Sequence, residues 1–279
     1  MSHYTYALID GVLHQNAIKE LYKSKQPIQV IPLYMGTRFE ANHDLGPILV
    51  AALEGSTLID TLKDTWTESV TLIHSDHYLR EVATHLSQFI TVTDETGSNA
   101  LFRFADPVVT WYWLNSYEQN ALPDILGPIA AWQIQRPKAD WQTEQAQWDT
   151  YTNPNTAPLQ FKINYLNEPQ TKALDEAADF RFKNQQYNLL IEKANNPFQD
   201  KTEQQITDWL DQVITDAETN HLNTERGIGI WVDLAADYGQ DFLTQPQGEY
   251  QTWLAENLQH KPLPLEVKLE TYYKQLYNI

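Results

Sequence analysis

The chain has 279 residues, enough for two domains, and no cysteine, which excludes disulfides, thiolate metal sites and a cysteine nucleophile. It carries 37 acidic against 19 basic residues, for a formal net charge of −18. Because surfaces that bind nucleic acid or anionic membranes are usually basic, we expect neither nucleic acid nor a membrane as a partner.

The start of the chain lacks the basic and apolar segments of a signal peptide. The longest nearly apolar run, Leu45 to Leu53, is about half as long as a membrane-spanning helix needs to be. These two features predict a cytoplasmic protein.

The first 138 residues alternate between short apolar runs, rich in β-forming residues, and segments with helical spacing. Turn residues such as Asp10-Gly11 separate the runs. This alternation predicts an α/β or α+β amino-terminal domain with a mixed sheet. The expected strands are 4–9, 28–34, 48–53, 70–73 and 128–134, with a hairpin of 90–93 and 100–105 and with helices at 17–21, 76–90 and 108–114.

The Asp106-Pro107 pair is typical of a helix start, with Asp106 as the N-cap and Pro107 at the first helical position. Arg103 lies three residues earlier. A charge-assisted hydrogen bond between Arg103 and Asp106 would pin the preceding strand to this helix. We therefore interpret the two residues as a structural clamp in preference to a ligand contact.

The composition changes after residue 138. Residues 139–165 are rich in Gln, Thr, Asp and Trp without a sustained period, which predicts a linker. Residues 166–279 have helical spacing throughout and predict an all-α carboxyl-terminal lobe of about five helices. The clearest apolar stripe runs from Ile206 to Ala217, with Asp200 or Thr202 as its cap.

A metal site is one alternative for the chemistry of the protein. If 76–90 is a single helix, His77, Glu81 and His85 share one face and could serve a metal-dependent hydrolase. However, the spacing from His77 to His85 spans about 12 Å of helix, which is too long for one ion unless the helix bends. A solvated face is the alternative interpretation. The nine Trp and fifteen Tyr residues leave open a carbohydrate- or peptide-binding module.

The densest acidic stretch is 202–260, which holds eleven acidic residues against Arg226 as the one Lys or Arg. It can serve solubility, or it can provide a field that is complementary to a basic partner. On the second interpretation, the residues expected to contact a partner are Glu203, Asp208, Asp211, Trp209 and Trp231.

Several segments, in order along the chain, resemble the Tap/TEC adaptor-chaperone family of bacterial type VI secretion effectors, whose members have a VasW-like domain. Tyr6 to Asp10 is similar to the opening strand of that family, and Leu45 to Val50 is similar to its P-x-L-V strand. The strongest likeness is at Ala100 to Pro107, where the family carries an R-F/Y-x-D-P signature. Ala105 departs from the aromatic or polar residue that is usual there.

The resemblance implies an adaptor and not an enzyme, with no catalytic residues, metal or cofactor. Such an adaptor binds a toxin effector in the cytoplasm of a Gram-negative bacterium and helps to load it onto the VgrG spike protein. The resemblance also implies that the amino-terminal domain is the shared element and that the helical lobe is specific to the client.

Overall fold

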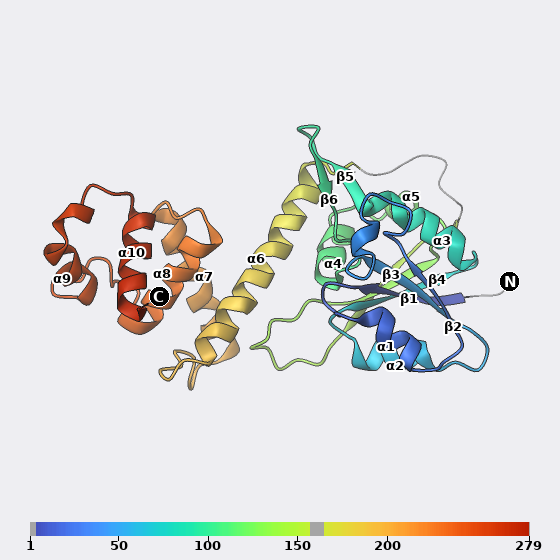
Figure 1. Cartoon of the computed structure of the whole chain (residues 1–279), viewed down its shortest axis with the longest axis horizontal. Coiled ribbons are helices and arrows are strands. Elements are labelled where there is room, and N and C mark those ends of the chain that lie inside the picture. Colours follow the sequence, from blue (N-terminus) through green and yellow to red (C-terminus); the bar gives the residue numbers. More distant parts are fainter. Residues whose placement is uncertain (1–3, 157–164, 279) are drawn as a thin grey trace. The chain divides into compact units, whose positions relative to one another are not determined.

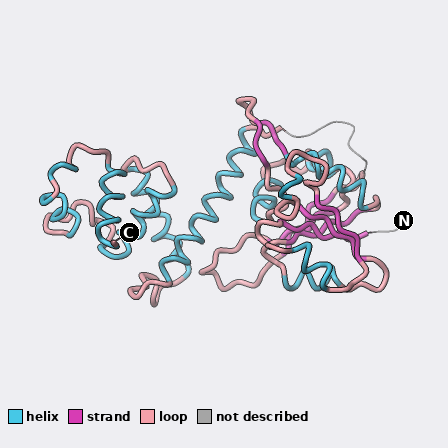
Figure 2. The backbone as a smooth tube through the Cα atoms, viewed as in Figure 1, coloured by secondary structure: helices cyan, strands magenta, loops and turns pink. Residues whose placement is uncertain are grey.

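The computed structural model describes residues 4–156 and 165–278, and these residues form two compact units. The first, which we call the sheet unit, comprises residues 4–138, 144–156 and 165–178. The second, the helical unit, comprises residues 139–143 and 179–278. In Figure 2 the strands belong to the sheet unit. The two-part fold class predicted from the sequence is confirmed.

A six-stranded sheet forms the centre of the sheet unit, in the order β2-β3-β1-β4-β7-β8. All of its pairings are antiparallel. The strand order makes β2 and β8 the two edges. A separate hairpin is formed by β5 and β6. The strands are β1 (Tyr4–Asp10), β2 (Ile28–Pro32), β3 (Pro47–Ala52), β4 (Val70–Ser75), β5 (Thr91–Thr93), β6 (Asn99–Leu101), β7 (Ala131–Gln135) and β8 (Trp148–Thr152).

Helices cover both faces of the sheet, and α1 and α2 lie beside each other in Figure 1. Because side chains alternate along a strand, Ala7 and Ile9 of β1 pack on α1 and α2, whereas Tyr6 and Leu8 face the opposite side. The larger of the two apolar clusters lies on that opposite side, under α3, α4 and α5. The helices of the sheet unit are α1 (Ala17–Lys23), α2 (Leu58–Thr65), α3 (Leu79–Leu86), α4 (Pro107–Asn115) and α5 (Leu122–Leu126).

Five α-helices of the described residues make up the rest of the fold: α6 (Glu168–Ile191), α7 (Glu203–Thr219), α8 (Glu225–Tyr238), α9 (Glu249–Glu256) and α10 (Leu265–Tyr277). The core of the helical unit contains the stripe that was predicted on α7, with Ile206, Leu210, Val213 and Ala217 buried. Thr202 caps α7 by accepting a hydrogen bond from the backbone N–H of Gln205, as predicted. Within residues 4–156 and 165–278, no helix is long and apolar enough to cross a membrane.

The interval 139–165, which we predicted as a linker, contributes to both units. Its residues Trp148 to Thr152 form the edge strand β8, which pairs with β7. Residues 139–143 belong to the helical unit, where Trp141 is buried and donates a hydrogen bond to Thr207 over 2.9 Å. Residues 157–164 of this interval lie outside the described part of the chain.

Candidate functional site

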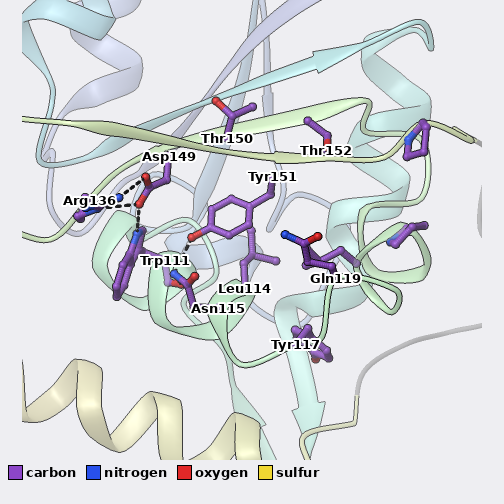
Figure 3. Close-up of a pocket in the computed structure, with 13 residues that line it drawn as sticks. Trp111, Leu114, Asn115, Tyr117, Gln119, Arg136, Asp149, Thr150, Tyr151 and Thr152 are labelled. Atoms are coloured by element: carbon purple, nitrogen blue, oxygen red, sulfur yellow. Dashed lines mark hydrogen bonds and ion pairs between the residues drawn. The ribbon is translucent and has the colours of Figure 1, made fainter.

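A groove with a volume of about 580 Å³ runs beside β8, between this edge strand and helices α4 and α5 (Figure 3). Its size is that of a typical ligand pocket. Strand β8 supplies one wall, since Asp149 and Tyr151 point toward α4. The groove is lined by Trp111, Leu114, Asn115, Tyr117, Gln119, Leu122, Pro123, Arg136, Asp149, Thr150, Tyr151, Thr152 and Pro154.

The two charged side chains of the lining neutralise each other. Arg136 donates from Nε to Oδ2 of Asp149 over 3.0 Å and from Nη2 to Oδ1 over 2.8 Å. Trp111 donates its indole N–H to the same Oδ2 over 2.7 Å. Hydrogen bonding to Arg136 is the main reason why the pKa of Asp149 is lowered, so the pair stays ionised at neutral pH. The groove therefore presents little net charge to a ligand.

Tyr151 forms the second polar contact of the groove. Its phenol oxygen accepts a hydrogen bond from Nδ2 of Asn115 over 2.6 Å, and its ring packs into the larger apolar cluster. Burial raises the pKa of Tyr151 above the ordinary value, so the phenol stays protonated at neutral pH. The groove thus offers a ligand a neutral phenol, an amide and an ion pair whose two charges satisfy each other. These groups can form hydrogen bonds and packing contacts.

The predicted contact between Arg103 and Asp106 is present, and it includes a third residue. Nη2 of Arg103 lies 3.3 Å from Oδ2 of Asp106 and 3.0 Å from Oδ2 of Asp10. Asp106 also caps α4, because its carboxylate accepts from the backbone N–H of Val108 over 3.0 Å. Arg103 therefore joins the end of β1 to the start of α4.

Both carboxylates of this clamp are buried: Asp10 is 4% exposed and Asp106 is fully buried. Burial raises the pKa of Asp10, and Arg103 opposes this shift. Oδ1 of Asp10 also accepts from the backbone N–H groups of Val12 and Leu13 over 2.9 and 3.0 Å, which shapes the turn after β1. These contacts tie the clamp to the end of β1, the turn after it and the start of α4.

The histidine face predicted for a metal ion does not form. Helix α3 begins at Leu79 and not at residue 76, so His77 lies before the helix. His77 approaches Glu81 to 3.6 Å, but His85 is buried and its Nε2 contacts the carbonyl oxygen of Ile125 over 2.9 Å. Across residues 4–156 and 165–278, no group of three or more His, Asp or Glu side chains could hold a metal ion.

The acidic residues expected to contact a partner lie on α7, and they differ in exposure and in their contacts within the helical unit. Asp208 and Asp211 are both exposed, although Asp211 forms a 2.6 Å ion pair with Lys183. Glu203 accepts a hydrogen bond from the backbone N–H of Thr143 over 2.8 Å, so it helps to hold residues 139–143 in the helical unit. Asp208 accepts a hydrogen bond from Nε2 of Gln204 over 2.8 Å, so each of the three acids has a partner within the helical unit.

The two tryptophans expected beside these acids are part of the core or close to it. Trp231 is only 2% exposed and packs edge-on against Phe242, with ring centroids 4.9 Å apart. It cannot contact a partner on the folded surface, so that prediction is wrong. Trp209 is half-buried and packs against Phe198 at 5.3 Å, which leaves part of its ring accessible. The apolar stripe that suggested a binding surface is mainly a core stripe.

Sequence reasoning missed the groove because β8 lies in the interval assigned to a linker. A usable signal was present, since every residue from Trp148 to Thr152 except Asp149 is a β-forming type. Asp10 was recognised only as part of a turn, because the sequence does not show that its carboxylate meets Arg103.

Residues 5–123 match the family model of a domain of unknown function, DUF4123. The matched interval includes Asp10, Arg103 and Asp106, as well as the α4 wall of the groove. Strand β8 and the helical unit lie outside it. No curated protein and no solved structure matches the chain.

Proposed function

We propose that this protein is a non-catalytic adaptor chaperone of type VI secretion. It binds a toxin effector in the cytoplasm of a Gram-negative bacterium and helps to load the effector onto the VgrG spike protein. The observation that carries the proposal is the DUF4123 match over residues 5–123, because this domain is known in type VI secretion effector adaptors. The motifs that resemble the Tap/TEC family, which occur in order along the chain and include Arg103 and Asp106, also support the proposal.

The chemistry of the groove is consistent with binding a polypeptide. Its charged residues are paired with each other, and its tyrosine is protonated at neutral pH. Its other lining side chains are apolar, aromatic or uncharged. Such a surface favours apolar and hydrogen-bonded contacts over recognition of a charged metabolite.

The charge of the helical unit supports a second contact. Asp208 places negative charge on the exposed surface of α7, where Asp211 is already paired with Lys183, and a basic surface of a client would be attracted to it. This attraction would speed association more than it would strengthen the final complex.

The test is reconstitution with the proteins encoded beside this gene. The full chain is co-expressed with the neighbouring toxin and, separately, with the neighbouring VgrG protein, and complexes are measured by size-exclusion chromatography with light scattering. We expect a stable complex with the toxin. A toxin and a spike protein from an unrelated secretion cluster serve as matched controls. Absence of binding to both neighbouring proteins, or equal binding to the controls, would contradict the proposal.

A further inference from the structure

We propose that the open edge of β8 binds an extended segment of a partner polypeptide, which adds to the sheet as a further strand and places uncharged side chains in the groove. The inference rests on the proposed function for the identity of the partner, the toxin effector. The surface itself is defined by backbone geometry, by the position of β8 in the sheet and by the lining of the groove.

The hydrogen-bond register shows which backbone groups are available. The N–H of Arg136 donates to the carbonyl of Gln147, and the N–H of Asn153 donates to the carbonyl of Ala130, each over 2.8 Å. Because facing residues alternate in an antiparallel pair, Asp149 and Tyr151 direct their backbone groups toward β7. Trp148, Thr150 and Thr152 therefore direct their N–H and C=O groups away from the sheet.

Among residues 4–156 and 165–278, no strand lies on the outward side of β8, because β8 is the last strand of the sheet. Thr150 and Thr152 are exposed, and among the described residues no other segment hydrogen-bonds to their backbone. An edge of this kind is a template for an incoming strand. The three outward residues offer donors and acceptors along the whole length of β8, which is about 17 Å.

The opposite edge of the same sheet is less suited to pairing. Strand β2 directs Ile28, Val30 and Pro32 outward, since the N–H of Leu33 donates to the carbonyl of Pro47. Pro32 has no N–H, so it removes one donor from that edge. No proline or lysine occupies the outward positions of β8. The sheet therefore protects one edge and leaves the other open.

The groove determines which side chains such a strand would carry. Alternate residues of an added strand would point to the α4 side of the sheet, where the groove lies. Arg136 and Asp149 satisfy each other, so a charged side chain inserted there would find no free counter-ion. Of the apolar lining residues, Leu114 is fully buried and Leu122 is 8% exposed, so a ligand would mainly meet uncharged polar and aromatic groups such as those of Gln119 and Tyr117. The occupant is therefore an extended segment with uncharged side chains, such as those of Val, Ile, Phe or Tyr, at alternate positions.

The first test uses synthetic peptides and the full chain. Capped peptides of about seven residues, the length of a typical strand, alternate Thr with Val, Ile, Phe or Tyr; matched control peptides carry Lys or Asp at the same positions. Amide hydrogen exchange is measured at Thr150 and Thr152. We expect the apolar series to slow both amides about tenfold or more, and the charged series to have no effect. Equal protection by both series, or protection by neither, would overturn the proposal.

The second test uses proline substitution at the edge. Thr150→Pro removes an outward donor and no hydrogen bond within the sheet, whereas Thr150→Val keeps the donor; Ile28→Pro is the same change on the opposite edge. Because proline has no amide hydrogen, the readout is the Thr152 amide: we expect Thr150→Pro to abolish its protection by peptides, and the other two variants to keep it. Unchanged protection of the Tyr151 amide shows that β8 is still folded, and Thr152→Pro repeats the test if it is not.

The affinity of the toxin for wild type and for Thr150→Pro distinguishes this inference from the proposed function. If the toxin binds the wild-type chain and binds Thr150→Pro at least about tenfold more weakly, the proposal is supported. If the toxin binds both equally well, the adaptor function stands and the edge proposal is wrong. If Thr150 and Thr152 become protected as the chain is concentrated without peptide, the occupant is a second copy of this chain, which also overturns the proposal.

Discussion

The Arg103 clamp makes a sharp prediction for stability, because one cation serves two buried carboxylates. Arg103→Met keeps much of the side-chain volume but leaves Asp10 and Asp106 without their shared counter-ion. Removing one partner of a buried pair costs about 3 to 5 kcal/mol. The side chain of Arg103 is 37% exposed, so solvent already screens part of the interaction, and we expect a loss of about 2 to 3 kcal/mol.

Hydrogen exchange of the amides of the central strand β1, measured in the full chain, reports this loss for the sheet unit. At about 1.4 kcal/mol for each factor of ten, these amides should exchange about 30- to 100-fold faster in Arg103→Met than in the wild type. Arg80→Met is the matched control, because Arg80 is exposed on α3 and no ion pair to the described residues is formed by it. The control should change the free energy of unfolding by less than about 0.5 kcal/mol.

The pH dependence tests the electrostatic reasoning. Burial already raises the pKa of Asp10, and removing Arg103 would raise it further. A carboxyl group with a raised folded-state pKa is less costly to bury once it is protonated, so the deficit relative to the wild type should shrink as the pH falls from 7 to 5. A deficit that is independent of pH, or equal exchange rates in Arg103→Met and Arg80→Met, would refute the role given to the charge.

Three further predictions concern other parts of the chain. Trp231→Ala should destabilise the helical unit by about 3 to 5 kcal/mol, because it empties a core position, and loss of helical circular dichroism on mild heating would show this. Burial lowers the pKa of His85 to about 4, so the protein should lose stability as the pH falls from 6.5 through 4; His85→Gln should show a weaker loss in acid denaturation curves. Replacing Asp208 and Asp211 together with Lys should slow association with the toxin several-fold at low salt and little at high salt, as measured by stopped-flow binding.

Much of the fold was predictable because local patterns and tertiary packing agree. The run of β-forming residues at 4–9 lies in β1 as expected, and the Asp106-Pro107 pair begins α4 as expected. The Thr202 cap and the apolar stripe of α7 were likewise visible in the sequence. At each of these positions, short-range chemistry is enough to specify the element.

The features that were missed depend on contacts between distant residues. Strand β8 is only five residues long, and its pairing with β7 is what makes it a strand. Asp10 and Arg103 are 93 residues apart in sequence, so no local pattern joins them. Trp231 shows the reverse problem, because an apolar stripe looks the same in sequence whether it faces a core or a partner.

The ion pair in the groove leads to a last prediction, about selectivity. Arg136 is 52% exposed and Asp149 is 26% exposed, so the pair should contribute no more than about 1 kcal/mol to stability. Arg136→Gln should therefore fold normally, yet it leaves the carboxylate of Asp149 in the groove without its cation. Peptides with Lys at alternate positions should then protect Thr150 and Thr152 from exchange, whereas they have no effect on the wild type. The double variant Arg136→Gln with Asp149→Asn removes both charges and should return the preference to apolar peptides. If Arg136→Gln gains no affinity for the Lys peptides, the argument that charge pairing makes the groove select uncharged side chains is wrong.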